Sequence, residues 1–210
     1  PQSAPAIMLP MKVTDIGEFG LIERLIFMAN DAGVVATSAE TSPLLVGPGD
    51  DTAAWKTASG IALSTTDTVV EGVHFARQTI PWHDLGWKVV VANLSDIAAM
   101  GGTPIYALVT LGLPPDTPVS LIDNLYRGII EACQEYGTSI AGGDIVRSPT
   151  VFVSVTMNGV HPSNPLLRSQ ARDGDLIAVT GHLGSSKGGL ELMTLECPQR
   201  EIDDASAEYL

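Results

Sequence analysis

The chain has 210 residues, of which 45% are apolar and 17% are charged, so it can bury a sizeable core and lacks the composition of a disordered segment. Its formal net charge of −13 repels a nucleic-acid backbone. No apolar run approaches the roughly 18–20 residues that cross a bilayer, and the N-terminus lacks the pattern of a secretory signal. We therefore expect no nucleic-acid partner, no membrane partner and a cytoplasmic location.

Apolar periodicity and turn residues predict helices and strands along most of the chain. The expected elements are, in chain order, a helix at 15–32 capped by Asp15, strands at 44–46 and 61–65, a helix at 82–99, a strand at 105–113, a helix at 119–136, strands at 139–141 and 151–160, a strand at 176–180 and a helix at 185–195. This order indicates a mixed α/β layer architecture.

Two of the expected helices show a clear apolar stripe. In the first, the stripe consists of Leu85, Val89, Ala92 and Ala99, and in the second it consists of Leu121, Leu125, Ile129 and Cys133. Cys133 is therefore expected to be a small core residue, and the two cysteines of the chain show no metal-binding spacing.

The domain boundary is expected near residue 161, where prolines and mixed charges follow the last strand of the first α/β unit. We interpret residues 1–14 as a flexible N-terminal extension and residues 15–160 as one domain. Residues 161–210 are expected to form a linker and the start of a second, truncated α/β domain.

Four short acidic motifs are the candidates for chemistry. They are Gly49-Asp50-Asp51, Thr65-Thr66-Asp67, Asn93-Leu94-Ser95-Asp96 and Gly142-Gly143-Asp144. Three of them lie beside predicted strands, where open α/β sheets usually bind ligands. Taken singly, each aspartate is more often a turn residue, a helix cap or part of a solvated helix face.

Electrostatics favours a cation site if these aspartates lie together. Two carboxylates about 4 Å apart repel each other by roughly 4 kcal/mol at an effective dielectric constant of about 20. Hard oxygen ligands, including the hydroxyls of Thr65 and Thr66, suit Mg²⁺, Mn²⁺ or Ca²⁺ rather than zinc. The chain has no G-x-x-x-x-G-K-[ST] or G-x-G-x-x-G phosphate loop, so a nucleotide would be held through metal ions.

Two further residues have both a structural and a functional interpretation. His74 is either a hydrogen-bonded structural residue, which is the commoner case, or a ligand-binding residue. Arg168 is either a solvated surface residue or a bidentate partner of a phosphate group.

Six segments resemble one known family. They are Gly17-Glu18-Phe19, residues 47–53 (GPGDDTA), residues 64–75 (STTDTVVEGVHF), residues 93–101 (NLSDIAAMG), residues 140–144 (IAGGD) and residues 166–175 (LLRSQARDGD). In this order they resemble the thiamine-monophosphate kinase family. That family belongs to the superfamily that includes aminoimidazole ribonucleotide synthetase, selenophosphate synthetase and a hydrogenase-maturation dehydratase.

The resemblance implies Mg²⁺-assisted transfer of a phosphoryl group from ATP to thiamine monophosphate, giving thiamine diphosphate. It implies a homodimer in which two N-terminal domains share a β-barrel, followed by a second α/β domain, and more than one Mg²⁺ ion. The implied roles are Mg²⁺ binding by Asp51, Thr65, Thr66, Asp67, Asp96 and Asp144, ATP binding by Tyr126, Gly143, Asp144 and Arg168, and binding of the thiamine phosphate by His74. Because the chain stops before the downstream motif of the family's second domain, this truncated chain is not expected to be active by itself.

Two alternatives stay open at this point. One is another ATP-dependent member of the superfamily, of the hydrogenase-maturation or selenophosphate type, although no Gly-rich loop carrying Cys and Lys precedes Asp50. The other is a non-catalytic metal-binding dimerisation module.

Overall fold

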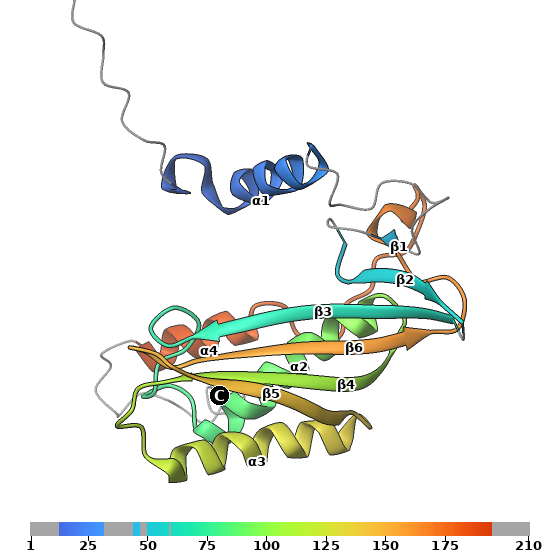
Figure 1. The fold of residues 1–210 in the computed structure, drawn as a ribbon. Helices are drawn as coiled ribbons and strands as arrows, with labels where there is room; N and C mark the ends of the chain where they lie inside the picture. The colour runs from blue at the N-terminus through green and yellow to red at the C-terminus, as the bar shows by residue number, and fades with distance from the viewer. Residues whose placement is uncertain (1–12, 32–43, 47–49, 59, 195–210) are drawn as a thin grey trace, which may run out of the picture.

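The computed structural model describes residues 13–31, 44–46, 50–58 and 60–194. Its elements, shown in Figure 1, are α1 (Val13–Asp31), β1 (Leu44–Val46), β2 (Ala53–Thr57), β3 (Gly60–Val70), α2 (Trp82–Ala99), β4 (Thr103–Leu113), α3 (Val119–Glu135), β5 (Ser139–Arg147), β6 (Phe152–His161), the 3₁₀ helix η1 (Arg168–Gln170) and α4 (Ser185–Thr194). None of the helices within these ranges is long and apolar enough to cross a membrane.

The strands form one open sheet of mixed direction in the order β1-β2-β3-β6-β4-β5. All neighbouring pairs are antiparallel except β4 and β5, which are parallel. The predicted mixed α/β class is therefore confirmed. The predicted β-barrel is one that two copies of the chain would share. The sheet of this single copy is open.

Helices α2 and α3 cover one face of this sheet (Figure 1). Alternate residues of the central strands point towards the helices and are buried, as the two-residue period of a strand requires. They include Leu63, Val109, Val155 and Met157, which pack with residues such as Ile97 of α2 and Ile129 of α3. The opposite face carries polar and half-exposed side chains, so the two faces of the sheet differ chemically.

Strands β3 and β5 are longer than predicted, and this difference affects the candidate site. β3 runs to Val70 instead of ending at residue 65, and β5 runs to Arg147 instead of ending at residue 141. The polar residues of β3 remain in the strand because β6 pairs with it from Ile61 to Val70. Tertiary pairing thus overrides the weak strand propensity of these polar and glycine-rich segments.

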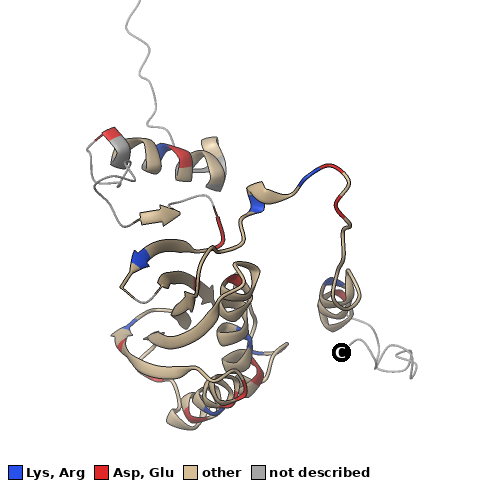
Figure 2. Cartoon of the chain, turned by 90° about the vertical axis from the view of Figure 1, so that its right-hand side faces the viewer, with Lys and Arg blue, Asp and Glu red and all other residues tan. Residues whose placement is uncertain are grey.

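Three other predictions about the elements were wrong. Strand β2 was not expected at all, and α1 begins at Val13, so Asp15 lies inside the helix and does not cap it. The predicted strand at 176–180 does not form: in the described part of the chain no strand pairs with it, and Leu176 and Ile177 are 98% and 96% exposed. Figure 2 shows this segment as an extended connection between η1 and α4.

The apolar stripes of α2 and α3 were predicted with unequal success. Leu125, Ile129 and Cys133 of α3 are buried, and burial raises the pKa of the Cys133 thiol. In α2, Leu85 and Val89 are buried, but Ala99 is exposed. The buried face of α2 is wider than predicted and also includes Val90, Asn93 and Ile97.

Glycines let α2 and α3 approach each other closely. A Cβ atom at Gly86 of α2 would lie 1.9 Å from the carbonyl oxygen of Leu125, and one at Gly128 of α3 would lie 1.9 Å from the carbonyl oxygen of His83. Any side chain at either position would therefore force the two helix backbones apart.

An exposed histidine links the same two helices. The Nε2 atom of His83 lies 2.7 Å from Oε2 of Glu131 on α3, and its Nδ1 atom lies 3.2 Å from Oδ1 of the adjacent Asp84. Asp84 first, and then Glu131, raise the pKa of His83 above its usual range, since both carboxylates favour the imidazolium form.

A pH-dependent contribution to stability follows from this histidine. Because the pKa of His83 is raised in the folded state, its contribution is complete below the unfolded pKa of about 6.5 and is lost as the pH rises through the folded value. We expect His83→Gln to lower the melting temperature at pH 5.5 and to have little effect at pH 9. A loss of equal size at both pH values in thermal denaturation would contradict this role.

Candidate functional site

Three carboxylates from three segments converge at the helix-covered face of β3. Asp67 lies on β3, Asp96 lies near the end of α2, and Asp51 lies in the bend before β2. Burial raises the pKa of Asp96 most, and the charges of Asp67 and Asp51 raise it further. The hydroxyl of Thr65 opposes this shift, since it donates a hydrogen bond of 2.6 Å to Asp96 Oδ2. These oxygens therefore form one acidic cluster.

Local periodicity explains why these groups share one face. Thr65 and Asp67 continue the alternation of the buried residues Ile61 and Leu63, so they point towards α2. On α2, Asp96 follows Asn93 by one helical turn, and Asn93 faces the same strand. The geometry thus brings together Asp51, Thr65, Asp67 and Asp96.

Arg168 supplies positive charge to this cluster. Its guanidinium forms a fork on Asp51, with Nη2 donating to Oδ1 and Nε lying 3.3 Å from Oδ2. It also approaches Asp50, whose Oδ1 is 3.8 Å from Nε, and the Arg168 backbone N–H lies 3.4 Å from Asp50 Oδ2. The hydrogen bond to Asp51 raises the pKa of Arg168. One cation thereby offsets part of the repulsion among the acids.

The donor set fits a hard divalent cation that a phosphate ligand completes. Among the residues that the structure describes, no group of three or more His, Cys, Asp or Glu side chains is close enough to hold a metal by itself. Mg²⁺ does not need such a group, because it usually takes one or two carboxylates and fills its octahedron with water and phosphate oxygens. The unfavourable ionisation of Asp96 beside two other acids is the feature that a cation would relieve.

Thr66 and Asp144 lie on the other face of the sheet. The Thr66 hydroxyl donates to the Val155 carbonyl at 3.1 Å and accepts from the Thr156 hydroxyl at 3.0 Å. Asp144 is level with Thr110, which pairs with Ser154, and Ser154 pairs with Thr68. Because directly paired residues share a face, Asp144 points to the side opposite to that of Asp67.

Gly143 and Tyr126 also lie outside the acidic cluster. Gly143 is level with Asp67, but β6 and β4 separate them, which amounts to three strand spacings or roughly 14 Å. A Cβ atom at Gly143 would lie 1.8 Å from the Val109 carbonyl oxygen, so the close approach of β5 to β4 requires glycine. Tyr126 is half-buried on α3 and packs against the core.

His74 lies in a turn directly after β3. Its Nδ1 atom accepts a hydrogen bond of 3.1 Å from the Val70 N–H, and its own backbone N–H bonds to the Val70 carbonyl. An ion pair between Arg77 and Glu71, with Nε and Oε1 2.5 Å apart, holds the base of the same loop. His74 is therefore held through both its ring Nδ1 atom and its backbone N–H, while the residue remains exposed.

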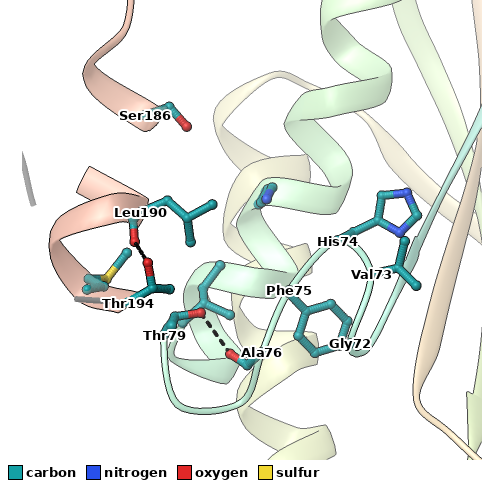
Figure 3. A pocket seen from close by; sticks show the side chains of 12 residues that line it. Gly72, Val73, His74, Phe75, Ala76, Thr79, Ser186, Leu190 and Thr194 are labelled. Atoms are coloured by element: carbon teal, nitrogen blue, oxygen red, sulfur yellow. Dashed lines mark hydrogen bonds between the residues drawn. The ribbon is translucent and has the colours of Figure 1, made fainter. Parts of the chain in front are cut away.

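This loop borders a cavity of about 310 Å³ (Figure 3). Lys88 of α2 and Ser186 and Leu190 of α4 also line it. The cavity thus combines apolar walls with the nitrogen groups of His74 and Lys88, a combination suited to an anionic ligand with a ring.

The central part of the chain matches a known family. Residues 49–161 match the family described as AIR synthase related protein, N-terminal domain. This chain belongs to that family. The matched region of this AIR synthase related domain contains Asp51, Asp67, Asp96 and Asp144, whereas Arg168 lies beyond it.

Two curated relatives of this chain share one name. The chain is 39% identical over 191 residues to a thiamine-monophosphate kinase of Aquifex aeolicus, and this alignment covers 91% of the chain and 57% of the relative. The chain is also 39% identical over 154 residues to a thiamine-monophosphate kinase of Bacillus subtilis. This alignment covers 72% of the chain and 47% of the relative. The chain therefore spans about half the length of the curated relatives it matches.

Solved structures agree with this relationship. A structure of AaThiL complexed with AMPPCP and TMP superposes with a TM-score of 0.80 at 37% identity, covering 96% of this chain and 60% of the other. A crystal structure of thiamine monophosphate kinase from Aquifex aeolicus gives a TM-score of 0.73 at 32% identity, covering 95% and 60%.

Sequence reasoning missed two residues that lie beside the acidic cluster. Asp50 was considered only as part of its motif, yet it contacts Arg168. Asn93 was not assigned a role, although it is fully buried and binds the Asp67 backbone. Its position could have indicated a role. Asn93 lies four residues after Val89, on the apolar face of α2, and a buried amide at such a position needs hydrogen-bond partners.

Proposed function

We propose that the complete protein transfers the γ-phosphoryl group of ATP to thiamine monophosphate and produces thiamine diphosphate, with Mg²⁺ as cofactor. The convergence of Asp51, Asp67 and Asp96 in one acidic cluster carries this proposal, because phosphoryl transfer depends mainly on positioning and charge neutralisation. The relatives named thiamine-monophosphate kinase, and the AaThiL complex with AMPPCP and TMP, support the choice of substrates. A cytoplasmic location remains a prediction from the sequence.

In this proposal, the acidic cluster holds Mg²⁺ through Asp51, Thr65, Asp67 and Asp96. The bound ion neutralises charge on the phosphates of ATP and of the acceptor. Arg168 is already paired with Asp51, so phosphate oxygens compete for the same guanidinium fork. We expect Arg168 to exchange carboxylate for phosphate when the nucleotide binds.

The acceptor, thiamine monophosphate, has to be bound and positioned, but it does not have to be deprotonated by a base. The attacking group is a phosphate oxygen that is already ionised near neutral pH, so no residue has to remove a proton from it. We therefore assign His74 to binding of the thiamine phosphate, which agrees with its exposed ring beside the cavity of Figure 3.

The remaining candidates belong to a second part of the proposed site. Tyr126, Gly143 and Asp144 are proposed to contact ATP, and Thr66 and Asp144 to bind further Mg²⁺. Asp144 lies on the face of the sheet opposite to α2 and α3. The same face exposes Tyr106 (51%) and Leu108 (42%). Covering these side chains by a second copy, in a barrel formed by two sheets, is the proposed role of the homodimer.

A direct assay tests the proposed reaction. The complete protein with ATP, Mg²⁺ and thiamine monophosphate should form thiamine diphosphate and ADP in equal amounts, and EDTA should abolish both products. ATP consumption only with another acceptor would indicate a different member of the superfamily, of the hydrogenase-maturation or selenophosphate type. Binding of Mg²⁺ without ATP turnover under any of these conditions would favour a non-catalytic dimerisation module.

A further inference from the structure

A buried amide connects α2 to the strand that carries the acidic cluster. Asn93 is 0% exposed, and it lies among the buried apolar residues of α2. Its Oδ1 atom accepts a hydrogen bond of 3.1 Å from the backbone N–H of Asp67. Its Nδ2 atom donates one of 2.9 Å to the carbonyl of Val89, one helical turn earlier. Burying an amide is unfavourable unless it is paired, and here both ends of the amide are paired.

These bonds form part of a two-point connection between helix and strand. Asn93 binds Asp67, and Asp96, three residues later on α2, accepts the hydroxyl hydrogen bond of Thr65, two residues earlier on β3. Residues three apart on a helix and two apart on a strand each share a face. The relative position of the Asp67 and Asp96 carboxylates is therefore set at both points.

At Asp67, β3 is paired with a neighbouring strand on one edge only, so the hydrogen bond to Asn93 supports its other edge. The pairing of β3 with β2 ends at Ser64, whereas its pairing with β6 continues to Val70. The Asn93 side chain provides a hydrogen-bond acceptor to the backbone beyond the end of β2. The bond to Val89 restricts rotation of the Asn93 side chain, so the acceptor is held in place.

From this geometry we infer that Asn93 is a positioning residue of the acidic cluster, which holds the backbone at Asp67 so that the Asp67 and Asp96 carboxylates can bind one divalent cation. This inference rests on the proposed cation site. Asn93 itself need not touch the cation, because its two amide atoms are already bonded to the backbone. Partners that orient metal ligands typically contribute 10–100-fold to metal affinity.

The test is Mn²⁺ binding by the complete protein in the presence of the non-hydrolysable nucleotide AMPPCP, measured by electron paramagnetic resonance. Mn²⁺ prefers the same oxygen ligands as Mg²⁺. We expect Asn93→Leu, which keeps the approximate volume and removes both hydrogen bonds, to weaken Mn²⁺ binding by about 10–100-fold. Faster amide hydrogen exchange at Asp67 should accompany the loss. Asn93→Ser provides a second variant with the same expectation if Asn93→Leu does not fold.

A control separates positioning from stability. Ile129→Val changes a fully buried side chain of α3, a helix that carries none of the residues of the acidic cluster. It should lower the melting temperature and leave Mn²⁺ affinity unchanged. If a folded Asn93 variant binds Mn²⁺ within twofold of the unmodified protein, the positioning role is overturned. If the unmodified protein binds no Mn²⁺ even with AMPPCP present, the proposed cation site fails together with the inference.

Discussion

Replacing Asp96 by asparagine is expected to weaken Mg²⁺–ATP binding and to reduce thiamine diphosphate formation, each by at least about 100-fold. This estimate exceeds the 10–100-fold effect typical of residues that only orient a metal ligand, since Asp96 would contact the cation directly. Isothermal titration of Mg²⁺–ATP and the coupled formation of ADP and thiamine diphosphate measure the two quantities. Asp67→Asn should have an effect of the same order.

Asp96→Asn should also stabilise the cation-free protein. Burial first, and then the charges of Asp67 and Asp51, raise the pKa of Asp96, so the ionised form of Asp96 is unfavourable in the folded state. A group with a raised folded pKa stabilises the fold only while it is protonated, and ionisation removes that contribution as the pH rises. Asparagine is uncharged and can still accept the Thr65 hydrogen bond. We expect a gain of up to about 1 kcal/mol, or roughly 2–4 °C in melting temperature without Mg²⁺.

Asp123→Asn is the matched control for this prediction. Asp123 is an exposed carboxylate on α3, outside the acidic cluster. Its replacement changes the net charge by the same amount and should affect neither Mg²⁺–ATP binding nor stability measurably. Unchanged binding in both Asp67→Asn and Asp96→Asn would show that the acidic cluster is not the cation site.

Gly86→Ala is expected to cause the largest loss of stability, at least about 3 kcal/mol, which is the upper part of the range for overpacked cores. The added Cβ atom would lie 1.9 Å from the Leu125 carbonyl oxygen and 3.0 Å from the Ile129 nitrogen. These are backbone atoms, so no change of side-chain rotamer relieves the overlap and α2 must move away from α3. The higher helix propensity of alanine, about 0.8–1 kcal/mol, offsets only part of this cost.

A second glycine in a helix provides the control. A Cβ atom at Gly188 of α4 would meet no atom within 4 Å. Gly188→Ala should therefore leave the urea midpoint unchanged or raise it slightly, whereas Gly86→Ala should lower it clearly. Equal effects of the two substitutions would contradict a close contact between α2 and α3. Because α2 carries Asp96 and Asn93, loss of this contact should also weaken Mg²⁺–ATP binding.

Much of the fold was predictable wherever local pattern and tertiary environment agree. The spacing of Leu125, Ile129 and Cys133 identified the buried face of α3, and all three residues are buried. The prediction failed where pairing partners decide the outcome. β3 extends through its polar residues because β6 pairs with it, whereas residues 176–180 are mostly apolar but have no partner strand in the described part of the chain.

The sequence by itself determined which donor atoms the candidate site offers. Aspartates and threonines in recognisable motifs predicted hard oxygen ligands, and the order of the motifs resembled one kinase family. These conclusions need only residue types and their order, because ligand preference follows from the donor atom.

Only the tertiary structure decided which of these groups lie together. Thr65 and Asp67 face α2 beside Asp96, whereas Thr66 faces the opposite side of the sheet. Asp144 also lies on that opposite side, as its register with Thr110 shows. The physical reason is the two-residue period of a strand: the face of each side chain depends on the register, and long-range pairing sets the register. The buried amide of Asn93 depends on the same packing of α2 against β3.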